Sequence, residues 1–106
     1  MADLAAIFSG MKSNFNAEKA SGVNATVQFD LSGDGGGLWY AEIADGSLDL
    51  QEGKVTSPSA TISMDADDFE KMSNGELNAM MAFMSGKIKV QGDLNTVMQF
   101  QSLVGM

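Results

Sequence analysis

Three aspartates, Asp65, Asp67 and Asp68, form the densest group of carboxylates in the chain. Clustered carboxylates can bind a hard cation or share a proton between them. The same residues also suit the first turn of a helix, where they accept hydrogen bonds from free backbone N–H groups and interact favourably with the helix dipole. Because a helical apolar pattern follows directly, the sequence favours helix capping over a metal or proton-sharing site.

A glycine-rich stretch, GDGGG at residues 33–37, is a second candidate for ligand binding. Such a loop can cradle a phosphate, but that motif also needs a following Gly-Lys-Ser/Thr and a helix, which are missing here. The stretch DLSGDG from Asp30 to Gly35 is similar to the start of a calcium loop, yet its twelfth position is Ala41 where a glutamate is required. Strand-like sequence flanks both patterns, so we predict a turn between two strands.

Several residue types that carry nucleophilic and acid–base chemistry are missing. The chain has no histidine, cysteine or arginine, which excludes Ser-His-Asp and Cys-His triads, disulfides and sulfur-based zinc sites. Its net charge of −8 opposes binding to nucleic acids and electrostatic attraction to anionic membranes. We therefore expect no catalytic residues, no metal, no cofactor and no nucleic-acid partner.

The sequence NAMMAFMSG at residues 78–86 concentrates methionine on one predicted helix. Leu77, Met80, Met81 and Met84 are spaced as i, i+3, i+4 and i+7, which places them on one helical face. Methionine is flexible and polarizable, so it adapts to irregular surroundings. Two interpretations stay open: the face is ordinary core, or it lines a cavity that accommodates more than one ligand shape.

Hydrophobic periodicity predicts the N-terminal elements that would position these residues. Helical spacing indicates a helix over about residues 3–15, with Asp3 as its N-cap. Alternating residues predict four strands, of which the third follows a strong hairpin signal at Asp45 and Gly46. In the first strand, Val27, Phe29 and Leu31 face one side and Thr26, Gln28 and Asp30 the other. The strands are predicted at residues 25–33, 38–45, 47–52 and 60–64.

The period becomes helical after the fourth strand. Asp65 with Asp68 predicts the start of a short helix, and Ser73 with Glu76 repeats this capping pattern before the methionine-rich helix. That helix is expected to end at Ser85 and Gly86.

A fifth strand is predicted over residues 87–92, with Lys87 and Lys89 pointing outward. Asp93 is then expected to cap a final helix. This helix is apolar on more than one narrow face, through Leu94, Val97, Met98, Phe100, Leu103 and Val104.

The predicted order is one helix, four strands, two helices, one strand and one helix. A chain of 106 residues with this order predicts a single α+β domain over residues 1–106. Its five-stranded, mainly antiparallel sheet would be covered on one face by helices. One such sheet cannot cover all of the apolar surface on the last two helices. Some of that surface must contact another chain or enclose a space.

Four motifs occur in order over nearly the whole chain: WYAEIADG at residues 39–46, ATISM followed by DDF within 60–69, GEL at 75–77 and MSGKIKVQGD at 84–93. This ordered set resembles the sterol carrier protein type 2 family. The resemblance implies an apolar tunnel between sheet and helices that binds fatty acids, fatty acyl-CoA, phospholipids or sterol-like molecules without converting them. It implies that the following residues bind the lipid: Trp39, Phe69, Met72, Leu77, Met80, Met81, Phe83, Met84, Ile88, Val97, Met98, Phe100 and Leu103.

The leading hypothesis is thus a lipid-binding protein that transfers or presents its ligand. The alternative is an accessory module whose apolar helix face packs on a partner enzyme or on a second copy of the chain. We expect no stable membrane insertion. The segment MADLAAIFSGMK lacks the basic start and long apolar core of a signal peptide, and QSLVGM is not a peroxisomal signal, so we expect a cytoplasmic location.

Overall fold

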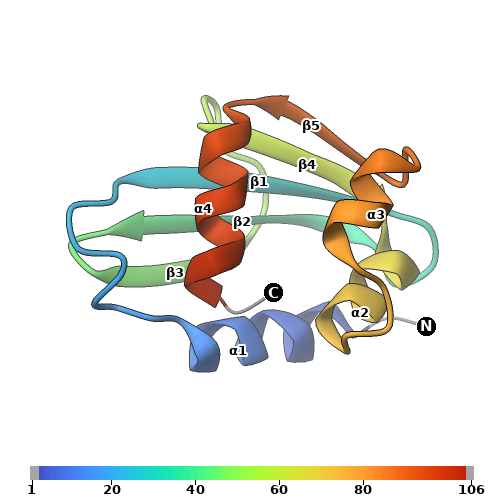
Figure 1. Cartoon of the computed structure of the whole chain (residues 1–106), viewed down its shortest axis with the longest axis horizontal. Coiled ribbons are helices and arrows are strands. Elements are labelled where there is room, and N and C mark those ends of the chain that lie inside the picture. The colour runs from blue at the N-terminus through green and yellow to red at the C-terminus, as the bar shows by residue number, and fades with distance from the viewer. Residues whose placement is uncertain (1–2, 105–106) are drawn as a thin grey trace.

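The computed structural model describes residues 3–104, and these form five strands and four helices (Figure 1). Their order confirms the predicted order of elements. In chain order they are α1 (Leu4–Asn14), β1 (Ala25–Ser32), β2 (Gly37–Ala44), β3 (Ser47–Glu52), β4 (Ala60–Asp65), α2 (Ala66–Ser73), α3 (Ala79–Met84), β5 (Ile88–Gly92) and α4 (Leu94–Val104).

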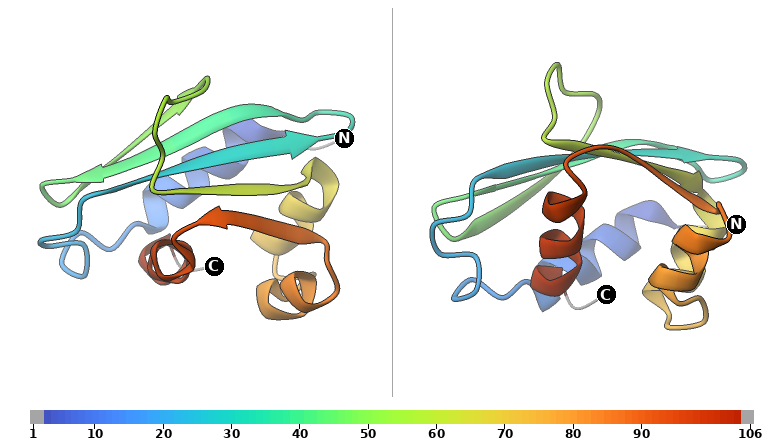
Figure 2. Two further views of the ribbon diagram at one scale, coloured as in Figure 1. Left: turned by 90° about the horizontal axis from the view of Figure 1, so that it is seen from above. Right: turned by 45° about the horizontal axis from the view of Figure 1, so that its top comes forward.

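The five strands form one sheet in the order β3-β2-β1-β4-β5. Only β1 and β4 pair in parallel, and the three other pairs are antiparallel. The four helices lie on one face of the sheet, while the segment over residues 53–59 crosses the other face (Figure 2). The fold is therefore the predicted α+β class, with a mainly antiparallel sheet covered on one face by helices.

The N-cap of α1 and the hairpin turn between β2 and β3 form as predicted. The Asp3 carboxylate accepts a hydrogen bond from the Ala6 N–H at 3.2 Å and caps α1. Asp45 and Gly46 have φ angles of 54° and 73°, as a tight hairpin turn between twisted strands requires. The turn thus fixes the register that pairs Ala41 with Leu50.

An aromatic cluster fills the space between the sheet and the helices. Phe8 of α1, Phe29 of β1, Phe69 of α2 and Phe100 of α4 are all buried. Their ring centroids lie 5.2–5.6 Å from neighbours in the cluster, in the range where aromatic pairs attract beyond simple area burial. Inward-facing strand residues surround these rings, so β1 and three helices share one core.

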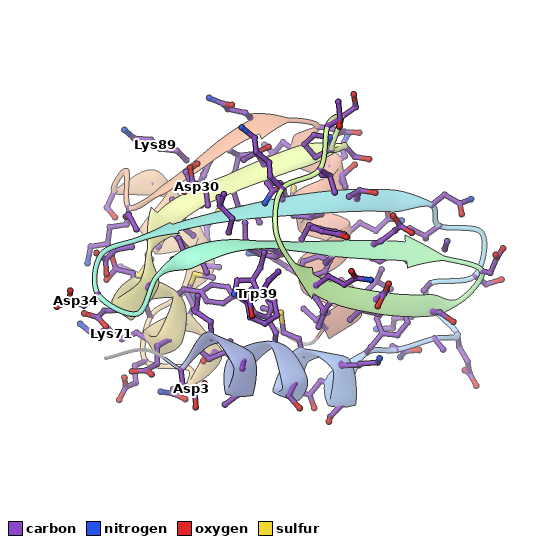
Figure 3. All side chains as sticks on the ribbon, turned by 180° about the vertical axis from the view of Figure 1, so that it is seen from behind. Asp3, Asp30, Asp34, Trp39, Lys71 and Lys89 are labelled. Atoms are coloured by element: carbon purple, nitrogen blue, oxygen red, sulfur yellow. The ribbon has the colours of Figure 1, made fainter. Side chains whose placement is uncertain are left out.

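Gln28 is the one buried polar side chain in the core of the described residues. Its amide nitrogen donates to the carbonyl oxygens of Trp39 and Gly53, at 2.9 and 3.0 Å. Its amide oxygen accepts from the Val55 N–H at 2.8 Å. Through these bonds Gln28, on the outward face of β1, holds the segment 53–59 to the sheet. This segment crosses the sheet in front in Figure 3.

Asp65 caps α2, because its carboxylate accepts from the Asp67 N–H at 2.8 Å. This confirms the capping interpretation of the aspartate cluster. The second predicted capping pattern is wrong, since Ser73 belongs to α2 and its hydroxyl donates to the Glu70 carbonyl at 2.7 Å.

Asn78 instead caps α3, and its side-chain oxygen accepts from two backbone N–H groups. Leu77 therefore precedes the helix, which is shorter than predicted. The helix ends as expected at Gly86, whose φ angle is 81°. The following Lys87 N–H donates to the Ala82 carbonyl at 2.9 Å, the hydrogen bond that closes a helix with a left-handed glycine.

Candidate lipid-binding groove

An open groove of about 300 Å³ lies between α3, β5 and α4. The three elements follow one another in the chain, and β5 packs beside α3 along the sheet edge (Figure 1). Ten residues line the groove: Asn78, Ala79, Met80, Phe83, Ile88, Val90, Leu94, Val97, Met98 and Gln101. Its volume is at the low end of the range for small-molecule sites.

A small void of about 20 Å³ lies deeper, between this groove and the aromatic core. Ile88, Val97 and Gln101 line both spaces, so the void continues the floor of the groove. Phe69, Met72 and Phe100 line the void but not the groove. A closed tunnel is not seen among residues 3–104. The apolar space between helices and sheet is an open groove with a small extension into the core.

The methionines of α3 are mostly exposed. Met80, Met81 and Met84 have exposed fractions of 60%, 69% and 79%, and only Ala82 of this helix is buried. The interpretation of this face as ordinary core is therefore wrong. This helix has only six residues, and Ala82 is the one residue among them that is fully buried, so its four large side chains stay at least partly exposed. Met80 and Phe83 line the groove, whereas Met81 and Met84 lie outside it.

The structure explains why α4 is apolar on more than one face. Phe100 and Leu103 are buried in the core, while the exposed Leu94 and Met98 line the groove. Val97 lies between the two sets and lines both spaces. One face of α4 therefore packs in the core against the sheet, and another face forms a wall of the groove.

The remaining residues of the predicted site lie away from the groove. Trp39 stacks on Phe8 with ring centroids 4.7 Å apart, beside α1 (Figure 3). Leu77 is half-buried against the core, and Leu103 is fully inside it. The structure thus groups Met80, Phe83, Ile88, Val97 and Met98 in the groove, but not Trp39, Leu77, Met81, Met84 or Leu103.

Five lining residues were not among the predicted site residues: Asn78, Ala79, Val90, Leu94 and Gln101. Gln101 is seven residues after Leu94 on α4, so it completes the i, i+3, i+4 and i+7 row of Leu94, Val97 and Met98. That spacing could have identified it. A search for apolar residues missed it because its side chain is polar.

The groove can act on a ligand only by burial and hydrogen bonding. None of its ten lining residues carries a charge or titrates. No group of three or more acidic side chains suited to a metal ion occurs within residues 3–104. Burial of an apolar molecule there is favourable by about 25 cal/mol per Å² removed from water.

A second pocket of about 350 Å³ lies between α1, α2 and the end of α4. It is slightly larger than the groove, but its lining includes the charged Asp3 and Glu70 and the polar Asn14, Ser73 and Asn74. Desolvating charged and polar groups without replacing their hydrogen bonds is costly. The groove is therefore the better site for an apolar ligand.

None of the helices described between residues 3 and 104 combines the length and hydrophobicity that a bilayer-spanning segment needs.

Residues 4–105 match the SCP-2 sterol transfer family. The α+β fold, with its apolar groove between helices and sheet edge, agrees with this match. The chain belongs to this family of lipid-transfer domains.

Among curated proteins, hydroxysteroid dehydrogenase-like protein 2 of Xenopus tropicalis is 33% identical over 99 residues. The match covers 92% of this chain and 24% of that protein. The chain thus spans about a quarter of the length of this relative.

Two solved structures share the fold at 18% identity. A double mutant of the sec-alkylsulfatase Pisa1 from Pseudomonas sp. has a TM-score of 0.83 over 92% of this chain and 15% of that one. Palmitated SCP2L2 from Aedes aegypti has a TM-score of 0.79 over 98% of this chain and 96% of that one. The fold therefore occurs both inside a larger enzyme chain and in a chain of similar size.

Proposed function

We propose that this domain binds a lipid in the groove between α3, β5 and α4 and transfers or presents it without chemical conversion. The observation that carries the proposal is the uncharged, mostly apolar lining of the groove. A lipid chain in this groove loses contact with water, and the gain is proportional to the apolar area buried. The absence of titratable groups from the lining supports binding rather than catalysis.

Met80 and Met98 supply opposite walls of the groove, from α3 and α4. Methionine side chains change rotamer readily and pack against varied shapes. Such walls suit a site that holds more than one chain length or degree of branching. The membership in a sterol transfer family and the palmitated structural neighbour both support a lipid as the ligand class.

An accessory role alongside a larger enzyme is a second candidate function. Met81 and Met84 are exposed outside the groove, so lipid binding there leaves them uncovered. The chain also aligns with about a quarter of a dehydrogenase-like protein. A partner enzyme or a second copy could cover this surface while the groove presents the lipid. The cytoplasmic location stays a prediction.

The test compares one substitution at two positions of α3. Met80→Trp fills the groove, whereas Met84→Trp places the same ring on an exposed site outside it. Both variants are titrated with Nile red, an uncharged dye that fluoresces in apolar sites, and the dye is displaced with dodecanol. We expect Met80→Trp to weaken binding roughly tenfold, about 1.4 kcal/mol, and Met84→Trp to bind like the parent protein.

Equal affinities for the two variants would show that the groove is not the lipid site. Extraction and mass spectrometry of lipid from freshly purified protein complete the test. A homogeneous dimer without bound lipid would instead favour the accessory role.

A further inference from the structure

Gln101 occupies a distinctive place in the groove. Its side chain lines both the groove and the void beneath it, together with Ile88 and Val97. Helix α4 sets this position, because residues 94, 97, 98 and 101 form one stripe along its surface. Any ligand that fills the groove to its floor therefore meets an amide group among apolar side chains.

The amide oxygen of the other polar side chain in the lining, Asn78, is already hydrogen-bonded. The side-chain oxygen of Asn78 accepts hydrogen bonds from the N–H groups of Met80 and Met81, at 2.9 and 3.2 Å. These bonds cap α3 and hold Asn78 at the end of the groove. Across residues 3–104 the side chain of Gln101 forms no comparable hydrogen bond, so its donor and its acceptor are both available to a ligand.

The lining offers no positive charge to a negatively charged head group. All six lysines lie outside the set of residues that forms the groove. A carboxylate placed at the floor would lose its hydration without gaining a cationic partner, which is unfavourable. The net charge of −8 on the whole chain adds a long-range repulsion.

We propose that Gln101 selects uncharged lipids with one hydroxyl head group, namely long-chain alcohols, over fatty acid carboxylates. A hydroxyl donates one hydrogen bond and accepts others, which matches a primary amide that also does both. The alkyl chain then lies along the apolar walls. This inference rests on the proposed lipid-binding function and adds the class of head group.

The experiment uses two ligands of equal chain length and differing head group. Dodecanol and dodecanoate displace Nile red from the parent protein and from Gln101→Leu, Gln101→Glu and Gln99→Leu at pH 7. Gln99→Leu is the matched control, because Gln99 lies on α4, is exposed and does not line the groove. Urea midpoints of all variants verify that each remains folded.

We expect the parent protein to bind dodecanol at least about tenfold more tightly than dodecanoate. Gln101→Leu should weaken dodecanol binding about fivefold, the effect of one lost hydrogen bond, while Gln99→Leu leaves it unchanged. Gln101→Glu should increase the preference for dodecanol over dodecanoate, because the new carboxylate repels the charged ligand.

The inference is overturned if the parent protein binds both ligands equally, or if Gln101→Leu and Gln99→Leu bind dodecanol alike. Both results leave the proposed lipid-binding function intact. If neither ligand nor dye binds the parent protein, the proposed function fails and this inference fails with it.

Discussion

At the scale of single residues, the side chain of Gln28 forms several hydrogen bonds that its position in the sequence does not predict. Alternation along β1 predicts an outward polar side chain, which is correct for direction. Yet the crossing segment 53–59 covers it, and the amide satisfies backbone groups of Trp39, Gly53 and Val55. A segment that crosses a sheet must leave few backbone groups unpaired, and Gln28 provides these partners.

We predict that Gln28→Leu destabilises the fold by roughly 2–4 kcal/mol. Leucine has a similar size, but it leaves several partly buried backbone groups without partners, at about 1–3 kcal/mol for each. The free energy of unfolding in urea measures the loss. Gln91→Leu serves as the control, because Gln91 is exposed and lies on β5, two strands away from Gln28 on β1. A loss for Gln28→Leu no greater than for this control contradicts the prediction.

Only some of the residues predicted to bind lipid line the groove. Ile88, Val97 and Met98 were predicted to bind lipid and do line the groove. Trp39 was predicted with them, yet it stacks on Phe8 under α1. Large apolar side chains serve core and groove equally well. Their pattern identifies inward-facing positions, while tertiary packing decides which of them border empty space.

At the scale of elements, β5 connects the two helices that form the groove. Gly86 lies in the turn before this strand and Gly92 is its last residue. Gly86 and Gly92 both have positive φ angles, of 81° and 91°. A side chain at Gly86 would meet nothing within 4 Å, whereas a Cβ at Gly92 would lie 2.6 Å from the carbonyl oxygen of Ser59. The two positions therefore share backbone strain but differ in steric contact.

We predict that Gly86→Ala costs about 1 kcal/mol of stability, the strain of a left-handed alanine. Gly92→Ala should cost at least about 2–3 kcal/mol, because the backbone of Ser59 must also move. Denaturant unfolding of the two variants gives the comparison. Equal losses would show that the backbone of Ser59 moves away from the new Cβ at no cost in stability, which contradicts the prediction.

Helix α3 shows why element boundaries were only partly predictable. Ser73 with Glu76 has the spacing of a capping box, but Ser73 completes the last turn of α2. Asn78 is an equally good cap, and it alone lies where the chain leaves the turn at Gly75, whose φ angle is 80°. Ser73 and Asn78 are thus both suitable N-caps by residue type, and the geometry of the turn at Gly75 decides which of them begins α3. The first four strands had no such competition.

At the scale of the whole molecule, acidic side chains outnumber basic ones fourteen to six. Self-repulsion at a net charge of −8 opposes the compact state. Dissolved salt screens this repulsion, since the Debye length falls from about 30 Å at 10 mM to about 8 Å at 150 mM.

We predict that the free energy of unfolding rises by about 1 kcal/mol as NaCl increases from 10 to 150 mM. A Glu18→Gln/Glu76→Gln variant, with two exposed acids removed, should show a smaller rise. Urea titrations at each salt concentration test both statements. A flat salt dependence in the parent protein would contradict them.

The parallel pairing of β1 with β4 brings together segments that are far apart in the chain. The antiparallel strands β1, β2 and β3 join through short turns, so they can pair early, whereas the neighbouring Thr26 and Ser59 are 33 positions apart. Closing that long loop costs chain entropy before any contact rewards it. We therefore expect docking of β4 on β1 to be the slow step of folding. Helix α3 buries only Ala82 and exposes its methionines, so we expect it to become ordered last and to open first.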